Sequence, residues 1–386
     1  MPEMRLFRRK RPRFNDAWGI FMKKILCVST HGAGGQDERR IHQLTTGLEA
    51  DLAFYNVDRT QPYPVAMQAL WKVITSQRWD LIYQEGTGIV GGLNLIRAAV
   101  TRKQKFVVSS GDPIAGFFHV TKGPAAGAVF GRYERALYRA CAGFVGWTPY
   151  LTGAALTMGA RRAVTVEGAV DLSQFVPYQA ADREAAKQGF GLDPAHLVCG
   201  VVGSLRWTPR QSYCYGLELV ETLKRLKRSD VSLLIVGDGS GKDILQGRLP
   251  EALRGRAVFT GRLPEADVVR ALNAMDIGFI TQTLDQLGNY RLTTKLPEYL
   301  ACGLPIAMSP VPGFFDYVAS AGWALPALHP ASPEFHARCA TWLDQLEREE
   351  VTAKAQQARS IACERFDYTI LSQRFHLFIN SLLMPI

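Results

Sequence analysis

Short apolar segments alternate with amphipathic segments along most of the 386-residue chain. The apolar segments have the length of buried β-strands, and the amphipathic ones carry apolar residues at helical spacing. In the first half we expect strands at 24–29, 51–55, 80–83, 105–109, 143–146 and 163–166. Between them we expect helices such as 35–49, 62–77, 88–102 and 125–141. Strands that are separated by helices favour parallel sheets covered by helices.

The alternation stops at residues 167–194, which are polar and lack sustained apolar periodicity, and we expect a connector there. It then restarts, with expected strands at 197–202, 231–236, 257–260, 277–280 and 305–309. The expected helices of this half are 216–227, 264–274, 294–302 and 334–348, and an amphipathic segment at 368–383 follows them. The pattern predicts an α/β fold of two Rossmann-like, doubly wound parallel-sheet domains with a ligand cleft between them. The expected divisions are a leader at 1–21, an N-terminal domain at 22–175, a C-terminal domain at 190–363 and a final helix within 364–386.

Composition narrows the class of protein. Hydrophobic residues make up 47% of the chain, which is enough for large cores. The seven cysteines form no CxxC pair and no Cys/His cluster, so we expect neither a structural zinc site nor a disulfide framework. Reduced thiols fit a cytoplasmic protein. No run of 18 apolar residues exists, so we expect no transmembrane helix.

Much of the positive charge lies at the N-terminus. Residues 1–21 hold six basic and two acidic residues, a net +4 of the formal +10. This leader lacks the apolar core of a signal peptide. One interpretation is a disordered tail, or a start of translation assigned too far upstream. The other is a segment that contacts anionic lipid at the inner face of the membrane. No motif that reads RNA or DNA accompanies the charge, so nucleic acid is not an expected partner.

The segment 293–306, TTKLPEYLACGLPI, reads as a loop, a short helix and the start of a strand. The N-terminus of a helix offers unpaired N–H groups and a partial positive charge that suit a phosphate. Glu298 falls in the first turn, where its carboxylate can accept hydrogen bonds from a ribose diol. Gly303 and Pro305 mark the end of the helix. The alternative is a helix whose glutamate is only solvated.

Glycine-rich turns follow three of the expected strands, at 31–35, 203–207 and 237–242. Gly34 and Gly35 resemble half of a dinucleotide fingerprint, but Asp37 stands at the third glycine position, so an ordinary strand-to-helix turn is the alternative. The turn 237–242 mimics a P-loop but is one residue short. Asp243 also stands where Ser or Thr would hold magnesium, so we exclude an ATP-hydrolysing P-loop.

Four stretches of the second half, in their order and spacing, resemble the nucleotide-binding domain of GT-B-fold retaining glycosyltransferases of family four, the glycosyl transferases group 1. These are VVGSLRW at 201–207, LLIVGDGSG at 233–241, VFTGRLPEADVVRALNAMDIGFI at 258–280 and TTKLPEYLACGLPI at 293–306. The first half matches more loosely, through its first glycine-rich loop and VEGAVDLSQF at 166–175. The family closes with a helix that crosses back to the first domain, a role that suits 368–383.

The resemblance implies roles in donor binding. The backbone of Arg262 would contact the base, Glu298 the ribose, and the amides around Thr294 and Leu296 the phosphates. The loop with Gly34 and Gly35 would lie against the donor phosphates, and Gly237 belongs to the same donor-binding set. The family requires no metal ion and no cofactor besides its nucleotide-sugar substrate.

The chain departs from the family at the basic residues that stabilise the leaving diphosphate. A leaving nucleoside diphosphate gains negative charge, which fixed cations stabilise. The family usually has Arg and Lys where this chain has Ser204 and Tyr215. The candidates to replace them are Arg206, Arg210, Arg291 and Lys295, because arginine in particular stays charged and binds two oxygens. The alternative for each is an ordinary surface cation. Tyr290 stands at the position of an acid that contacts sugar hydroxyls, so the transferred sugar is left unnamed.

Catalytic candidates lie in the first half. Relatives often carry a His-Asp pair after the fourth strand; here Asp112 is in place, but Gly111 holds the histidine position. His119 lies seven residues further on, and Glu85 follows the third strand. A carboxylate there can orient an acceptor hydroxyl and take its proton. The alternative is that Asp112 caps the next helix.

These features together predict a retaining, metal-independent glycosyltransferase. It would move a sugar from a nucleoside-diphosphate sugar to a hydroxyl acceptor, either a glycan or a lipid-linked molecule. Two alternatives stay open. One is a nucleotide-sugar epimerase on the same fold, and the other is a non-catalytic binder or regulatory subunit, which the missing cations at Ser204 and Tyr215 favour.

Overall fold

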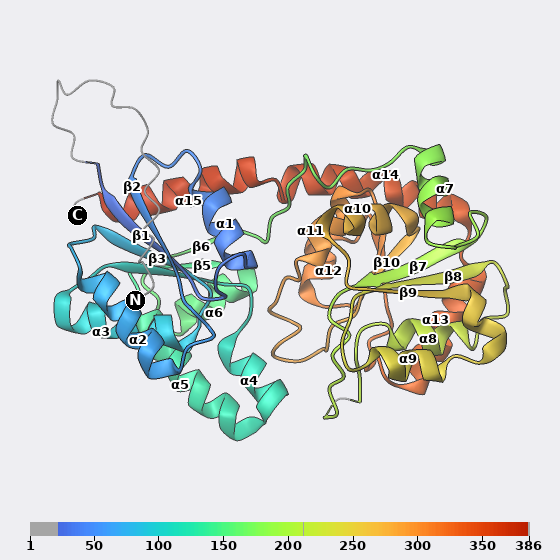
Figure 1. The fold of residues 1–386 in the computed structure, drawn as a ribbon, viewed down its shortest axis with the longest axis horizontal. Helices are drawn as coiled ribbons and strands as arrows, with labels where there is room; N and C mark the ends of the chain where they lie inside the picture. The colour runs from blue at the N-terminus through green and yellow to red at the C-terminus, as the bar shows by residue number, and fades with distance from the viewer. Residues whose placement is uncertain (1–21, 211, 385–386) are drawn as a thin grey trace. The chain divides into compact units, whose positions relative to one another are not determined.

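The computed structural model of the protein describes residues 22–210 and 212–384 (Figure 1). The leader at 1–21 lies outside the described residues. Two compact units divide the chain: unit 1 comprises the residues up to Glu167 and those from Tyr368 onward, and unit 2 comprises Gly168–Asp367. Each unit holds a six-stranded parallel sheet with helices around it, which confirms the predicted α/β fold class.

The sheet of unit 1 has the strand order β2-β1-β3-β4-β5-β6. Its strands are β1 Lys24–Ser29, β2 Asp51–Asn56, β3 Leu81–Glu85, β4 Phe106–Ser110, β5 Gly143–Gly146 and β6 Ala163–Thr165. Its helices are α1 Gln36–Thr45, α2 Tyr63–Thr75, α3 Ile89–Arg102, α4 Ile114–Lys122, α5 Pro124–Ala140, α6 Pro149–Thr157 and α15 Tyr368–Leu383. Strands β3, β4 and β5 are buried along their whole length, as expected for a parallel sheet covered on both faces.

The sheet of unit 2 has the order β12-β11-β10-β7-β8-β9. Its strands are β7 Leu197–Val202, β8 Val231–Val236, β9 Ala257–Gly261, β10 Ile277–Ile280, β11 Ile306–Met308 and β12 Gly322–Ala324. Its helices are α7 Ala180–Gly189, α8 Leu217–Leu223, α9 Lys242–Arg248, the 3-10 helix η1 Glu251–Arg256, α10 Glu265–Ala274, α11 Lys295–Ala301, α12 Pro312–Tyr317, α13 Pro333–Gln345 and α14 Arg348–Arg365. Strands β8 and β9 lie on one side of β7, whereas β10 and the strands after it lie on the other side. Ligands of such sheets bind beyond the carboxyl ends of the strands at this switch between β7 and β10.

Two expectations about secondary structure are wrong. The expected connector at 167–194 contains α7, and a second helix, α14, follows the one expected at 334–348. Both helices escape a search for apolar periodicity because they bury few large side chains. Helix α14 buries only Val351, Ala358 and Ala362 along its 18 residues. Alanine packs closely without producing a strong apolar stripe.

Helix α15 covers the expected segment 368–383 and packs in unit 1 against α1. The ring Nε2 of His376 lies 2.8 Å from the carbonyl oxygen of Leu44, which belongs to α1. Arg374 donates to the carboxylate of Glu167 at 2.8 Å. The last helix of the chain is therefore part of the first unit, although the whole of unit 2, Gly168–Asp367, separates it from the rest in sequence.

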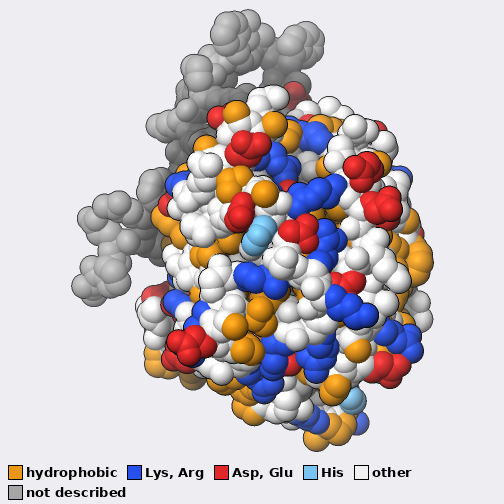
Figure 2. All heavy atoms as spheres, turned by 90° about the vertical axis from the view of Figure 1, so that its right-hand side faces the viewer, with side chains coloured by type: hydrophobic (Ala, Val, Ile, Leu, Met, Phe, Trp, Pro, Cys, Tyr) orange, Lys and Arg blue, Asp and Glu red, His pale blue; other side chains and the backbone are white. Residues whose placement is uncertain are grey.

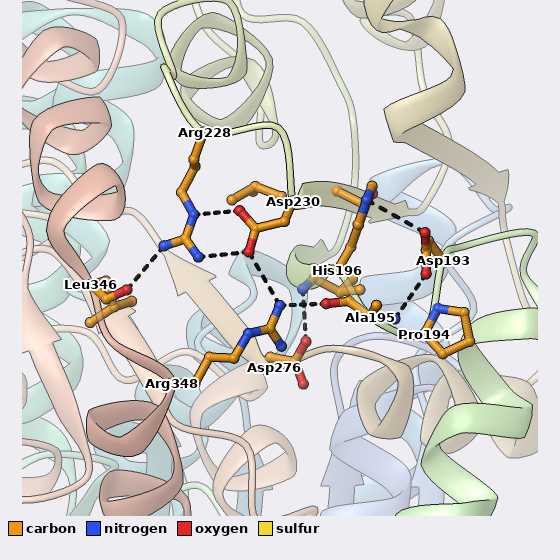
Figure 3. A network of polar contacts seen from close by, with 12 residues as sticks. Asp193, Pro194, Ala195, His196, Arg228, Asp230, Asp276, Leu346 and Arg348 are labelled. Atoms are coloured by element: carbon orange, nitrogen blue, oxygen red, sulfur yellow. Dashed lines mark hydrogen bonds and ion pairs between the residues drawn. The ribbon is translucent and has the colours of Figure 1, made fainter.

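A polar network ties α14 to the amino-terminal edge of the second sheet (Figure 3). Arg228 donates from Nε and Nη2 to the two carboxylate oxygens of Asp230, at 2.7 and 2.8 Å. Its Nη1 donates to the carbonyl oxygens of Leu343 and Leu346. Arg348, at the start of α14, pairs with Asp230 at 3.4 Å and donates to the carbonyl of Ala195. These amino-terminal ends of the strands lie opposite to the carboxyl ends, where a ligand is expected. We therefore assign the network a role in the stability of unit 2 and not in ligand binding.

Replacing Asp230 with asparagine is expected to lower the free energy of unfolding at pH 7 by about 1 kcal/mol, the upper range for partly exposed ion pairs. The hydrogen bonds from Arg228 hold the pKa of Asp230 well below its usual value of 3.8. A carboxylate with a lowered pKa stabilises the fold above pH 3.8 and loses that contribution as the pH falls further. Urea denaturation should therefore show a difference that shrinks below pH 3.8, and Glu184→Gln, at an exposed position, should show none. A constant difference at all pH values would contradict the assignment.

The face of unit 2 that Figure 2 shows carries Lys and Arg side chains with Asp and Glu among them. Opposite charges that alternate on a surface favour solubility over binding to a polyanion. The face gives no support to nucleic acid as a partner.

Candidate functional site

The carboxyl ends of β7 and β10 carry the two loops that build a cavity in unit 2. The cavity has a volume of about 160 Å³ and is lined by residues from 204–215, from 281–291 and by Pro330. The loops begin where the order of the strands reverses, between β7 and β10. The cavity therefore occupies the place where a doubly wound sheet is expected to bind its ligand.

Helix α11 is held beside this cavity by Tyr299, whose buried hydroxyl accepts a hydrogen bond of 2.7 Å from the N–H of Val202 at the end of β7. The first residue of the helix, Lys295, places its ammonium Nζ 3.4 Å from the centre of the Tyr215 ring. A Cβ at Gly203 would lie 2.5 Å from the same Nζ. Glycine at 203 thus allows the lysine to reach the aromatic ring, a cation–π contact that holds its charge in place.

The pKa of Lys295 is lowered from 10.5 to about 7. Burial is the largest cause, and the positive charge of Arg291 lowers the pKa further. The carboxylates of Glu218 and Glu298 act in the opposite direction. Near neutral pH the amine of Lys295 is therefore only partly protonated. An anionic ligand beside it would raise its pKa.

The floor of the cavity is a hydrogen-bonded network around Glu218. Its carboxylate is fully buried and accepts from the hydroxyl of Tyr213 at 2.9 Å and from the N–H of Gly216 at 3.1 Å. Thr281 donates to the same group at 3.3 Å and also contacts the Tyr213 hydroxyl. Burial raises the pKa of Glu218. The network fixes Tyr213 and Thr281, whose side chains line the cavity.

The glycine turn after β8 is packed inside unit 2. Gly237 has φ +139° and donates its N–H to the carbonyl of Gly261 at 2.9 Å. A Cβ at 237 would lie 1.8 Å from the carbonyl oxygen of Gly203, so only glycine fits. The N–H of Gly241 donates to Leu205 at 2.8 Å. This turn does not form a phosphate cradle; it aligns the ends of β7, β8 and β9, next to the exposed Arg262.

The structure brings some of the predicted donor-binding residues together and leaves others apart. Arg206 and Arg291 line the cavity together with Tyr215, and Lys295, which does not line it, lies over the Tyr215 ring. Arg210 is exposed and does not line the cavity. Tyr290, 37% exposed, does not line it either.

The remaining predicted residues lie along α11. Thr294 is the N-cap of the helix, without a side-chain capping bond. Leu296 is fully buried, so only its backbone can face a ligand. Glu298 is partly buried in the first turn. The positions of these residues on α11 are those that the sequence predicted, and their contacts with phosphates and a ribose stay a prediction.

The first glycine-rich loop of unit 1 leads into α1. Gly34 has φ +73°, and its N–H donates to the carboxylate of Glu38 at 2.5 Å. Gly35 is the N-cap of α1. Beside them the Nδ1 of His31 lies 2.6 Å from the buried carboxylate of Asp37, which also accepts from Thr30. In the sequence Asp37 is only a departure from a glycine pattern, and no local motif marks His31 as its partner.

The hydrogen bond that His31 makes to the carboxylate of Asp37 raises the pKa of His31 above its ordinary value of 6.5. We expect Asp37→Asn to lower that pKa, because the neutral amide no longer favours the imidazolium. The ring resonances of His31, followed by NMR from pH 5 to pH 9, report it directly. His376 serves as the control, since its Nε2 contacts a backbone carbonyl and not an acid. An unchanged His31 titration would contradict the pairing.

Glu85 is not placed to meet a ligand. It is 1% exposed, and Ser109 and the Trp147 ring nitrogen donate to its Oε1 at 2.7 and 3.1 Å. Tyr83 and Arg40 contact the other oxygen. Burial raises the pKa of this carboxyl. The predicted catalytic acid at 85 is in this structure an internal counter-ion.

Asp112 and His119 lie at and after the end of β4, as predicted. The N-cap of α4 is Pro113, which makes no side-chain capping bond, and the role of Asp112 stays a prediction. The carboxylate of Glu134, on α5, accepts from the N–H groups of Ile114 and Ala115 at 2.9 and 3.0 Å instead. His119 is exposed on α4 and packs beside Gly127 of α5.

Within 22–210 and 212–384, no group of three or more His, Cys, Asp or Glu side chains is arranged to hold a metal ion. In the same part of the chain, no helix has the length and apolar character needed to cross a membrane.

Comparisons with known proteins agree with the geometry. Residues 196–344 match the family model described as glycosyl transferases group 1. HepE from Anabaena, solved in complex with UDP and glucose, is similar to this chain with a TM-score of 0.71 and 17% identity, over 94% of this chain and 100% of that one. Sucrose-phosphate synthase from Thermosynechococcus elongatus is similar with a TM-score of 0.71 and 15% identity, over 93% and 99%. No curated protein sequence matches this chain with significance. At these identities the solved structures show the fold, which is GT-B.

Proposed function

We propose that this GT-B-fold protein, whose residues 196–344 belong to the glycosyl transferases group 1, moves a sugar from a nucleoside-diphosphate sugar to a hydroxyl acceptor. The proposal includes retention of configuration, independence of a metal ion, and a glycan or lipid-linked acceptor. The observation that carries it is the cluster of Lys295, Arg291 and Arg206 around Tyr215, inside the matched region. HepE, which has the same fold, was solved with UDP and with UDP-glucose.

The cluster supplies what the departing diphosphate requires. Breaking the bond to the sugar leaves negative charge on phosphate oxygens, and preorganised cations in a partly dry site stabilise that charge. The chain lacks the usual cation at Tyr215, but Lys295 brings its ammonium onto that same ring. We propose that Lys295 replaces the missing lysine and that Arg206 and Arg291 replace the missing arginine.

Asp112 is our candidate for orienting the acceptor hydroxyl, with His119 as a second candidate. Asp112 follows the carboxyl end of β4, where ligands of such sheets bind, and His119 lies on the next helix, α4. The basic leader at 1–21 supports a location in the cytoplasm at an anionic membrane surface, where a lipid-linked acceptor would be found.

The first experiment is a nucleotide panel. UDP, GDP, ADP and CMP are added separately, and the melting temperature is followed, because a ligand that binds the native state raises it. The nucleotide that binds then selects the donor sugars, and release of the diphosphate is measured over a broad acceptor panel with and without EDTA. Failure of all four nucleotides to bind would overturn the proposal. Loss of turnover in EDTA would overturn metal independence alone.

Glu298→Gln is expected to weaken binding of the cognate nucleotide by roughly 10- to 100-fold, because hydrogen bonds to a charged acceptor contribute about 1.5–3 kcal/mol. The 2′-deoxy and 3′-deoxy nucleotides sharpen the test. They should bind the wild type more weakly than the parent nucleotide does, and the variant should discriminate against them less. Isothermal titration calorimetry measures all the affinities. Equal discrimination in both proteins would show that the carboxylate does not bind the ribose.

A non-catalytic binder is the second candidate, and the residues Ser204 and Tyr215 favour it. It predicts tight nucleotide binding without diphosphate release over the whole acceptor panel. Turnover with any acceptor would exclude it.

A further inference from the structure

One layer of helices in unit 1 carries exposed positive charge and no exposed acid. Helices α2, α3, α5 and α4 pack against one another, and Figure 1 shows them on the opposite side of the sheet from α1 and α15. Their one acidic residue is Glu134, which is 1% exposed and accepts hydrogen bonds from backbone N–H groups at the start of α4. Their exposed basic residues are Lys72, Arg97, Arg102, Lys122, Arg132, Arg135 and Arg139. This layer, unlike the mixed-charge face of unit 2 in Figure 2, therefore attracts an anionic partner.

The hairpin formed by α4 and α5 adds exposed apolar surface to this charge. Between residues 113 and 131 the sequence holds a single Lys and no Arg, Asp or Glu. The rings of Phe118 and Phe130 stack with their centroids 3.4 Å apart and join the two helices. Their neighbours Phe117 and Val129 are 41% and 60% exposed. Single exposed apolar residues are ordinary, but an exposed hairpin of this composition indicates a surface that contacts an apolar medium or partner.

The apolar and basic residues of α5 share one side of the helix. Intervals of three or four residues separate Val129, Arg132, Arg135 and Arg139, all of which are exposed. Residues at such intervals are neighbours on a helix surface. With a rise of roughly 1.5 Å per residue, Arg132 lies about 4.5 Å and Arg139 about 15 Å along the axis from Val129. A segment at a membrane surface buries its apolar side chains about 5–10 Å deep and keeps its basic residues at the lipid phosphates. The hairpin has the same order of apolar and basic residues.

We propose that the hairpin of α4 and α5 docks on an anionic lipid bilayer. Phe117 and Val129 enter the apolar layer, and the arginines of α5 bind lipid phosphates. The charge selects this occupant over a second copy of the chain, because two copies would bring surfaces of like charge together. A nucleic acid would match the charge but would leave the apolar part of the hairpin uncovered.

The inference deepens the proposed function and rests on it for the lipid-linked acceptor. Helix α4 begins two residues after Asp112, the candidate for orienting the acceptor hydroxyl, and Phe117 lies in its first turn. A bilayer on the hairpin would therefore hold a lipid-linked acceptor beside the carboxyl end of β4. The docking surface and the acceptor side of unit 1 then belong to the same connection between β4 and β5.

Cosedimentation of the full chain with vesicles tests the docking. The vesicles contain either phosphatidylcholine alone or a two-to-one mixture of phosphatidylcholine and phosphatidylglycerol. We expect the anionic vesicles to bind at least about tenfold more tightly, and the difference to shrink in high salt, which screens exposed charges. Equal binding to both kinds of vesicle, or binding to neither, would overturn the inference. The leader at 1–21 is the same in every variant below, so the variants report the contribution of the hairpin.

Phe117→Ser removes the apolar contact. We expect it to weaken binding to anionic vesicles by about three- to tenfold, because less apolar surface leaves the water. Phe315→Ser is the matched control: Phe315, on α12 of unit 2, is 63% exposed and lies edge-on to Phe314 at 5.2 Å, as Phe117 lies edge-on to Phe118 at 5.4 Å. The control should bind as the wild type does. Melting temperatures show whether both variants are folded, and equal losses in the two variants would contradict the assignment to the hairpin.

A triple variant removes the charge of α5. Replacing Arg132, Arg135 and Arg139 with Gln should weaken binding by about 10- to 100-fold, since each basic residue near an anionic surface contributes about a fivefold gain. The control replaces three exposed basic residues of unit 2 with Gln, namely Lys227, Arg254 and Arg365. It loses the same net charge and should lose little affinity. A control that loses as much as the triple variant would show that net charge, and not this surface, determines binding.

The outcomes separate this inference from the proposed function. None of the hairpin substitutions lies in unit 2, so nucleotide affinity should keep its wild-type value in these variants. Nucleotide binding without vesicle binding would leave the function standing and overturn the inference. Vesicle binding through the hairpin without nucleotide binding would overturn the function and support the docking surface alone. A dimer that Phe117→Ser dissociates, measured by light scattering, would assign the hairpin to a second copy of the chain and overturn the bilayer as its partner.

Discussion

Replacing Lys295 with methionine is expected to reduce turnover by about 100- to 1,000-fold, the usual loss when one preorganised group that stabilises developing charge is removed. Nucleotide affinity should fall less, because the charge on the leaving oxygen is larger in the transition state than in the bound donor. Methionine keeps the unbranched stem that packs on Tyr215 and removes only the ammonium. Single-turnover rates and nucleotide affinities, measured separately with the cognate donor, show the split. Turnover within about threefold of wild type would exclude Lys295 from the chemistry.

The lowered pKa of Lys295 provides a second readout of the same variant. With a pKa of about 7, the amine is mostly neutral at pH 8. A diphosphate beside it raises that pKa, so binding at pH 8 should take up close to one proton. Calorimetry in two buffers with different ionisation enthalpies measures the uptake, which should disappear in Lys295→Met. Equal apparent enthalpies for the wild type in both buffers would place the diphosphate elsewhere.

Stability separates this loss of function from unfolding. The unfolded chain holds the proton of Lys295 up to a pKa of 10.5, and the folded chain only up to about 7. The unfolded state therefore binds more protons between these values, and the penalty from Lys295 is complete below pH 7 and shrinks as the pH rises to 10.5. The methionine variant should be at least as stable as the wild type at pH 7. A variant that is both inactive and unstable would point to packing and not to charge.

The fold was accessible from the sequence because parallel strands buried on both faces leave continuous apolar runs. Strand β8, VSLLIV, is buried at every residue and was expected at the same bounds. Helix α11 was also placed correctly to within a residue, since Gly303 and Pro305 mark its end. What failed were helices such as α14, whose buried positions are mostly alanine.

The site was accessible only in part. The segment 293–306 carries a local pattern that predicts a phosphate-facing loop and an acid. The contact between Lys295 and Tyr215 joins residues 80 positions apart, and no local pattern reports it.

Glu85 shows a different limit. A strand buried on both faces has no polar alternation, so the sequence does not reveal whether its last residue faces a ligand or the interior. In the structure Glu85 faces the interior, where it pairs with Arg40, which is 45 residues upstream and 1% exposed. A buried carboxylate at the end of a strand is a catalytic candidate only if no buried cation comes from another element.

Arg40→Met is expected to lower the free energy of unfolding by about 3–5 kcal/mol, the range for removing one partner of a buried ion pair. Nη1 and Nη2 of Arg40 donate to the carbonyl oxygens of Glu167 and Val166, each at 2.7 Å. Its Nε lies 3.3 Å from the Glu85 carboxylate, and its guanidinium lies over the ring of Trp147. Methionine fills much of the space but leaves a buried carboxylate and two carbonyls without this donor. Chemical denaturation measures the loss, and Arg39→Met, at the exposed neighbouring position, should change stability little.

The pH dependence of that loss identifies the carboxylate as its source. Without Arg40, the pKa of Glu85 rises further above its ordinary value of 4.5, because burial is then less opposed by positive charge. A carboxyl whose pKa is raised in the folded state lowers stability above that pKa and recovers it as the pH falls toward 4.5. The Arg40→Met defect should therefore be smaller at pH 5 than at pH 8. In the double variant with Glu85→Gln the pH dependence should vanish, and the two substitutions should be far from additive. Additive losses that do not depend on pH would mean that Arg40 acts through its carbonyl contacts alone and that Glu85 is free to serve another role.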